Sequence, residues 1–181
     1  PQPTMQLDLF SALEETPTTD SQDATFTTQL DTLADVPHTY TLVDTPESRL
    51  ALCQKLCEQH CVAFDTETTS IQAITAQLVG MSFATAPGEA YYVPVPQNEE
   101  QCKILLEDFK PFFANPDIMK VGQNMKYDLM VLANYGVSVE GELFDTMLAH
   151  YVIQPEMRHN LDLLAEVHLK YKTISIETLI G

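Results

Sequence analysis

Two carboxylates, Asp65 and Glu67, stand two residues apart at the end of the apolar segment Cys61–Phe64. Alternate residues of a β-strand project to the same face, so a strand here directs both carboxylates to one side. Paired carboxylates are ligands for a hard divalent cation. The spacing alone is weak evidence, because a chain with 26 acidic residues among 181 contains about one Asp-x-Glu by chance. Two solvated acids at a strand end are the alternative interpretation.

A second segment supplies another acid and an amide. The short apolar strand that ends near Val121 is followed by a predicted helix, which contains Asn124 and Asp128. These two residues are four apart and therefore share one face of the helix. The combination strengthens the interpretation of Asp65 and Glu67 as functional.

Together these motifs resemble those of the DEDD family of 3′→5′ exonucleases. The order of segments is similar to that in the proofreading domain of bacterial DNA polymerase I, over roughly residues 38 to 181. The resemblance is carried by Val62–Glu67, Leu78–Ala84, Ala90–Val95, Val121–Asp128, Ala133–Gly136 and Phe144–Leu148.

This resemblance implies hydrolysis of the 3′-terminal phosphodiester of single-stranded or frayed DNA by two Mg²⁺ or Mn²⁺ ions. One metal lowers the pKa of a bound water, and the second, ~3.5–4 Å away, stabilises the leaving 3′ oxygen. Carried over from the family, Asp65 bridges the metals, Glu67 binds the nucleophile-side metal and Asp128 binds on the other side. Oxygen ligands fit Mg²⁺ or Mn²⁺, whereas zinc prefers nitrogen or sulfur.

The same resemblance implies contacts to the DNA strand. Ile71 and Ile176 match hydrophobic wedge positions that pack against the terminal bases. Arg158 matches an arginine that contacts phosphate. The remaining expected DNA-binding residues are Thr68, Gln123, Asn124 and Tyr127.

Structural roles are the alternatives for several of these positions. Tyr127 and Ile176 are equally suited to a hydrophobic core, and Asn124 is suited to a helix cap. Asp145 and Asp162 are interpreted as cap and surface residues rather than as metal ligands.

The fourth acid of the family lies in a Tyr-x-x-x-Asp motif, beyond the segment that resembles Tyr171 to Gly181. The literal Tyr-x-x-x-Asp of this sequence, Tyr40 to Asp44, precedes the first carboxylate strand and is interpreted as a chance match. We therefore interpret the domain as truncated before its last catalytic motif, with a site that is weakly active or inactive in this fragment. The start at Pro1 indicates a piece of a longer protein, whose polymerase domain is an expected partner.

Composition favours a soluble domain with an acidic character. The net charge of −17 appears at first unsuited to DNA binding, because polyanion binding usually requires a basic surface. Bound divalent metals reverse the local charge, and stacking and hydrogen bonding supply the other contacts. No apolar segment is long enough to span a membrane and no signal peptide is recognisable. The expected location is the bacterial cytoplasm, in association with the nucleoid.

The four cysteines lack the paired spacing of a zinc site. We expect them to be buried thiols in a reducing cytoplasm. The five histidines contain no pair four residues apart that would indicate a ligand cluster.

Residues 1–36 are rich in Thr, Asp, Gln and Pro and are interpreted as an interdomain linker that is partly disordered, followed by the exonuclease domain in residues 37–181. Within the linker, Gln6–Phe10 resembles the short peptide by which bacterial replication proteins dock on the sliding clamp. Local packing of a linker hydrophobe is the alternative.

The predicted elements are those of an α/β, ribonuclease-H-like fold. Three antiparallel strands are expected, with a hairpin at Pro87–Gly88, followed by a helix and a parallel strand, with helices flanking the mixed sheet. Thr45, Asp145 and Asn160 are expected to cap helices. The predicted strands are 38–43, 61–67, 77–84, 89–95 and 118–121, and the predicted helices begin near Pro46 and span 99–114, 124–135, 146–153 and 161–169.

Two other functions remain open at this point. An RNA-trimming DEDD exonuclease has the same acids, so the triad does not distinguish the substrate. A catalytically inactive scaffold module of a polymerase has the same fold, but the presence of Asp65, Glu67 and Asp128 argues against it.

Overall fold

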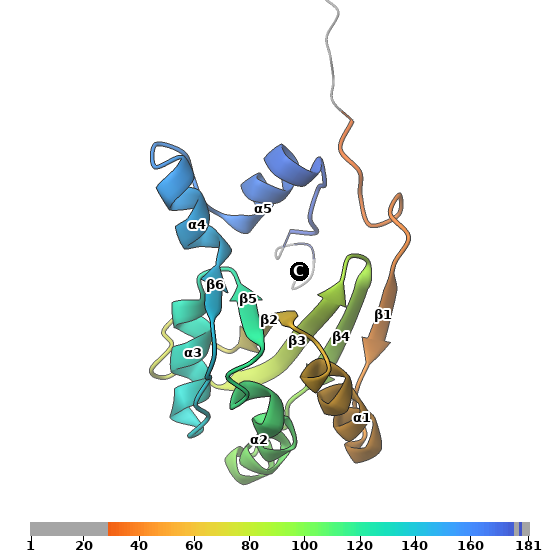
Figure 1. Ribbon diagram of the computed structural model, residues 1–181, viewed down its shortest axis with the longest axis vertical. Coiled ribbons are helices and arrows are strands. Elements are labelled where there is room, and N and C mark those ends of the chain that lie inside the picture. Colours follow the sequence, from red (N-terminus) through yellow and green to blue (C-terminus); the bar gives the residue numbers. More distant parts are fainter. Residues whose placement is uncertain (1–28, 176–177, 179–181) are drawn as a thin grey trace, which may run out of the picture.

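The computed structural model describes residues 29–175 and residue 178. Its centre is a six-stranded mixed sheet with the strand order β1-β4-β3-β2-β5-β6 (Figure 1). The strands are β1 (Thr39–Leu42), β2 (Cys61–Thr68), β3 (Leu78–Ala86), β4 (Glu89–Pro94), β5 (Met119–Gly122) and β6 (Leu143–Asp145).

Strands β2, β3 and β4 form the predicted antiparallel meander. The turn between β3 and β4 contains Gly88 at a φ of +76°, a left-handed conformation that favours glycine. Strand β5 pairs in parallel with β2, as predicted. The sequence did not indicate β6, which is parallel to β5 and has three residues, too few for a periodic pattern.

The helices are α1 (Pro46–Cys57), α2 (Glu99–Phe113), α3 (Met125–Asn134), α4 (Thr146–Ile153) and α5 (Leu161–Leu164). The helix predicted over residues 161–169 is divided, because a π-helical segment, η1 (Ala165–Leu169), follows α5. Asn160 occupies the N-cap position of α5 but its side chain makes no capping hydrogen bond. The predicted capping role of the Asn160 side chain was therefore wrong.

The hydrophobic core lies against the sheet and includes residues of α1, α2 and α3 (Figure 1). Phe83 of β3 stacks on Phe109 of α2 with ring centroids 5.3 Å apart, and Phe64 of β2 meets Phe113 edge to face. Large aromatic residues therefore fix α2 against the centre of the sheet.

The cysteines are free thiols in different environments. Cys53 and Cys102 are buried, and burial raises the pKa of each thiol to about 11, so both are inert at neutral pH. Cys57 is half-buried. Cys61 is exposed because it lies on the outward-facing side of β2, so its predicted burial was wrong. Across the described residues, no helix has the length and apolar character needed to cross a membrane.

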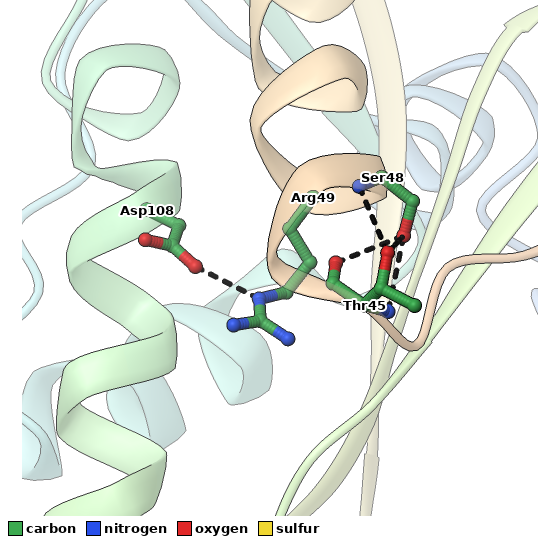
Figure 2. Close-up of polar contacts among 4 residues, drawn as sticks. All are labelled: Thr45, Ser48, Arg49 and Asp108. Carbon is green, nitrogen blue, oxygen red and sulfur yellow. Dashed lines mark hydrogen bonds and ion pairs between the residues drawn. The ribbon is translucent and has the colours of Figure 1, made fainter.

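Helix α1 is fixed at its start and along its side by polar contacts (Figure 2). Thr45 accepts a hydrogen bond from the backbone N–H of Ser48 at 3.1 Å, and the Ser48 hydroxyl accepts one from the Thr45 N–H at 3.1 Å. Arg49 donates through Nε to Asp108 of α2 at 2.8 Å. The predicted cap is confirmed, and the ion pair joins the two helices that cover the core.

Replacing Thr45 tests the contribution of this cap. Thr45→Ala removes the acceptor for the Ser48 N–H and should lower the free energy of unfolding by about 1 kcal/mol. Thr45→Ser keeps the hydroxyl oxygen and serves as the control. Urea unfolding followed by circular dichroism measures both, and an equal loss in the two variants would contradict a capping role.

Candidate active site

Strand β2 separates core residues from site residues by simple alternation. Val62, Phe64 and Thr66 are buried, whereas Asp65 and Glu67 are on the exposed face. The two acids therefore share one side of the sheet, as their spacing predicted. They lie on β2 near the middle of the six-stranded order, with β3 on one side.

The third acid reaches the same strand from helix α3. Pairing of β2 with β5 ends at Ala63, and beyond it the backbone N–H of Thr66 donates to Asp128 Oδ1 at 3.0 Å. The Thr66 hydroxyl donates to the same oxygen. Asp128 is only 3% exposed. The carboxylate thus takes the place of a neighbouring strand, and these bonds hold it beside the acid pair.

The three carboxylates lie close enough to influence one another. Protein atoms crowd the Asp65 carboxyl although the residue keeps solvent contact, and this burial is the first cause that raises its pKa to about 6. The negative charges of Asp128 and Glu67 raise it further. Burial also raises the pKa of Asp128, against the lowering effect of the Thr66 hydrogen bonds. A divalent cation would relieve this repulsion.

The ligand chemistry and the electrostatics fit a hard cation, but the geometry is not preassembled. In the part of the chain that is described, no three His, Cys, Asp or Glu side chains are arranged to hold a metal ion. One Asp128 oxygen is directed at Thr66. Metal binding at these acids would therefore require side-chain adjustment.

Asp145, at the end of β6, caps two helices at once. Its Oδ2 accepts from the Met125 N–H at 2.8 Å and its Oδ1 accepts from the Asn124 N–H at 3.1 Å, at the start of α3. It also accepts from the first amides of α4, Met147 and Leu148, at 2.9 and 3.2 Å. The predicted cap of α4 is confirmed, and the cap of α3 is an addition that the sequence did not indicate.

This arrangement changes the interpretation of Asn124. It occupies the N-cap position of α3 with a left-handed φ of 59°, but its side chain makes no capping hydrogen bond. Asp145 supplies the acceptor instead. The exposed Asn124 amide is therefore not used as a helix cap.

Four of the residues expected to contact DNA line one hollow. This hollow has a volume of about 470 Å³ and is lined by Thr68, Thr69, Ser70, Ile71, Asn124 and Tyr127. The Tyr127 phenol donates to the Ser70 carbonyl and is hydrogen-bonded to the Thr68 hydroxyl. Ile71 is 95% exposed. The loop after β2 and the start of α3 thus form one surface beside the acids.

The other expected DNA-binding residues lie apart from this hollow. Gln123 lines a neighbouring hollow that contains Asp65, and it is fixed by a 2.6 Å hydrogen bond to the His159 carbonyl and a 2.5 Å bond from the Thr146 hydroxyl. Arg158 is exposed on the loop between α4 and α5. Ile176 lies outside the described residues.

Tyr40 and Asp44 do not join the site. Tyr40 is in β1, which is three strands from β2, a separation of about 14 Å at the usual strand spacing. Its position is consistent with a chance match to the fourth motif.

Three histidines come together although each is nine residues from the next in the sequence. The His150 and His159 ring nitrogens are 2.7 Å apart, and the His150 and His168 rings are 5.5 Å apart between centroids. Residue spacing did not indicate this cluster, because it forms only when α4, the following loop and η1 pack together.

The mixed sheet and its flanking helices form a ribonuclease-H-like fold, which solved structures share. The catalytic core of RRP6 from Trypanosoma brucei aligns with a TM-score of 0.65 at 22% identity, over 85% of this chain and 41% of that one. Escherichia coli RNase D, described as an exoribonuclease involved in structured RNA processing, aligns with a TM-score of 0.63 at 17% identity, over 77% and 36%. Brucella melitensis NrnC with bound Mg²⁺ aligns with a TM-score of 0.61 at 20% identity, over 78% and 65%.

Sequence comparison gives the family. The profile of the 3′-5′ exonuclease family matches residues 40–181, and the chain belongs to this family. DNA polymerase I of Pseudomonas aeruginosa is 43% identical over 72% of this chain and 15% of its own length. DNA polymerase I of Borreliella burgdorferi is 33% identical over 96% of this chain and 19% of its own length. The chain therefore spans less than a fifth of the length of these relatives.

Removing the Asp65 charge should stabilise the metal-free protein. Because the pKa of Asp65 is raised in the folded state, ionisation of this carboxyl lowers the free energy of unfolding. The loss is complete above about pH 6 and disappears as the pH falls below the usual pKa of 3.8. Asp65→Asn should raise the free energy of unfolding at pH 7 by about 1 kcal/mol, since solvent screening reduces the value that the full shift would give.

Asp117→Asn, the same change at an exposed acid, is the control. Urea unfolding at pH 7 and pH 4 measures both variants, and the gain from Asp65→Asn should shrink at pH 4. A loss of stability at pH 7 would contradict the electrostatic explanation.

Removing Asp145 should loosen two helix starts together. Asp145→Ala deprives four N–H groups of their acceptor and should lower the free energy of unfolding by about 2 kcal/mol. Asp145→Asn keeps one acceptor oxygen and should lose less. Amide hydrogen exchange should show faster exchange at the first residues of both α3 and α4 in the Ala variant. Protection lost at α4 alone would contradict the shared cap.

Proposed function

We propose that this domain is the 3′→5′ proofreading exonuclease of a bacterial DNA polymerase I, which hydrolyses the 3′-terminal phosphodiester of single-stranded or frayed DNA. The observation that carries the proposal is the placement of Asp65, Glu67 and Asp128 at one site by β2 and α3. The polymerase I relatives, matched over most of this chain, support the identity of the parent protein.

The proposed cofactors are two Mg²⁺ or Mn²⁺ ions. Asp65 would bridge them, with Glu67 and Asp128 as ligands on either side. Mutual repulsion of these acids and the oxygen-only donor set support divalent cations. When bound, the metals would activate water and stabilise the leaving oxygen. The chain itself contributes the backbone positions of the acids, because β2 carries Asp65 and Glu67 and Thr66 holds the Asp128 carboxylate, and the acid side chains would adjust when metal binds.

The proposed DNA path runs from these acids into the hollow formed by Thr68, Ile71, Asn124 and Tyr127. The exposed Ile71 side chain is suited to pack against a terminal base, and Tyr127 and Asn124 offer polar groups to the sugar-phosphate backbone. Gln123 and Arg158 would extend these contacts toward the α4–α5 loop. Ile176 keeps its proposed role as a second wedge, outside the described residues.

We further propose that the parent chain supplies the fourth acid and a polymerase domain. Within the sequence, the only Tyr-x-x-x-Asp is the one that begins on β1, far from the acids. Association with the bacterial nucleoid follows from a DNA substrate. The linker role of residues 1–36 and the clamp-binding role of Gln6–Phe10 rest on residues that lie mainly or wholly outside the described part, and both stay hypotheses.

RNA trimming is the second candidate function. It is favoured by the fold that the chain shares with E. coli RNase D and the RRP6 core, although identities near 20% support the fold alone. An inactive scaffold is less consistent with the site, because all three acids are present and gathered around β2.

The test uses the full-length parent protein and 5′-labelled single-stranded DNA and RNA of the same sequence. With Mg²⁺, the protein should shorten the DNA from its 3′ end faster than the RNA. Asp65→Asn should reduce excision by at least about 100-fold and leave polymerisation unchanged, because it removes the proposed bridging ligand. Asp117→Asn should have no effect. Faster cleavage of RNA would favour the second candidate, and absence of cleavage in Mg²⁺ and Mn²⁺ would favour the scaffold.

A further inference from the structure

Tyr92 of β4 lies on the same face of the sheet as the catalytic acids. Its backbone pairs with Ser82 of β3, and Ser82 pairs on its other side with Asp65 of β2. Residues that are directly opposite in an antiparallel sheet project to the same side. Tyr92 is therefore two strands away from the acids, within reach of a long side chain.

The Tyr92 ring spans the strand between β4 and β2. Gly80 of β3 is the partner of Glu67, and it has no side chain to fill the space above its backbone. A Cβ added to Gly80 would lie 2.5 Å from Cζ and 2.7 Å from Cε2 of Tyr92, and closer still to the phenol oxygen. The ring therefore lies over Gly80, with its hydroxyl end directed across β3. Gly80 is buried.

The phenol oxygen lies over Gly80, the strand partner of Glu67, so the phenol is on the Glu67 side of the sheet, although the structure contains no hydrogen bond between the two side chains. Partial burial raises the pKa of Tyr92, and the negative charge of Glu67 raises it further. A tyrosine phenol, with an ordinary pKa of about 10, keeps its proton at physiological pH. Tyr92 remains 37% exposed, so the hydroxyl is also open to the site.

We propose that Tyr92 is a positioning residue for Glu67: when a divalent metal binds one Glu67 carboxylate oxygen, the phenol O–H donates a hydrogen bond to the other. The inference rests on the proposed function and extends it. Glu67 has three rotatable side-chain bonds and is repelled by Asp65, so a fixed neutral donor would restrict it without adding charge. Gly80 provides the space that brings the phenol to Glu67.

Two substitutions separate the hydroxyl from the ring. Tyr92→Phe keeps the ring over Gly80 and removes only the donor. Gly80→Ala keeps the phenol but adds a methyl group where the ring lies, which displaces it from Glu67. Tyr40→Phe is the matched control, because Tyr40 is an exposed tyrosine of β1 paired with Ala90 of β4.

The experiment measures single-stranded DNA excision by the full-length parent protein at varied Mg²⁺ and varied DNA. Tyr92→Phe should lower kcat about tenfold and raise the Mg²⁺ concentration for half-maximal rate, with KM for DNA and the melting temperature unchanged. Gly80→Ala should show the same Mg²⁺ dependence, and the double variant should be no worse than Gly80→Ala alone. Tyr40→Phe should match the wild type.

Unchanged kcat and Mg²⁺ dependence in Tyr92→Phe would overturn the proposal. A rise in KM for DNA alone would also overturn it and indicate a direct contact with the strand. If the wild-type protein excises nothing, the proposed function fails by itself. Calorimetric titration with Mn²⁺ then decides the role of Tyr92: weaker binding in Tyr92→Phe than in Tyr40→Phe supports positioning, and equal binding refutes it.

Discussion

The hydrogen bonds from Thr66 to Asp128 join the strand that carries two acids to the helix that carries the third. They form where β5 no longer pairs with β2, so the Asp128 carboxylate replaces a strand neighbour at an open edge. Without them, a buried carboxylate would lack part of its hydrogen bonding, at a cost of about 1–3 kcal/mol or more. The same bonds hold Asp128 close to the Asp65–Glu67 pair, and the proposed metal binding depends on this closeness.

The start of α3 is fixed from its other side by Asp145. One carboxylate at the end of β6 satisfies the first amides of α3 and α4, so β6, although short, determines where both helices begin. These contacts fix the helix that carries Asp128 close to Asp65, and burial together with the charges of Asp128 and Glu67 raises the pKa of Asp65. Repulsion between the ionised carboxylates therefore destabilises the metal-free domain, and a bound divalent cation would offset this repulsion.

Much of this arrangement is readable from residue patterns. Alternation along β2 predicted that Asp65 and Glu67 face one side, the Pro87–Gly88 turn predicted the hairpin, and Thr45 predicted the start of α1. These features are local: each depends on residues within a few positions of one another, where strand and helix periods and capping chemistry apply. The resemblance to the family motifs also predicted the ribonuclease-H-like fold and the third acid, Asp128.

Contacts between distant segments were decided by the tertiary structure. The sequence identified Asp145 as a cap of α4 but not of α3, because its second set of partners is about 20 residues away. The burial of Gly80 under Tyr92, the exposure of Cys61 and the meeting of His150 with His159 likewise depend on which strands and helices become neighbours. Residue types and spacing predicted which groups carry the proposed chemistry. Strand order and helix packing determined their partners, since hydrogen bonds and burial depend on proximity in space rather than along the chain.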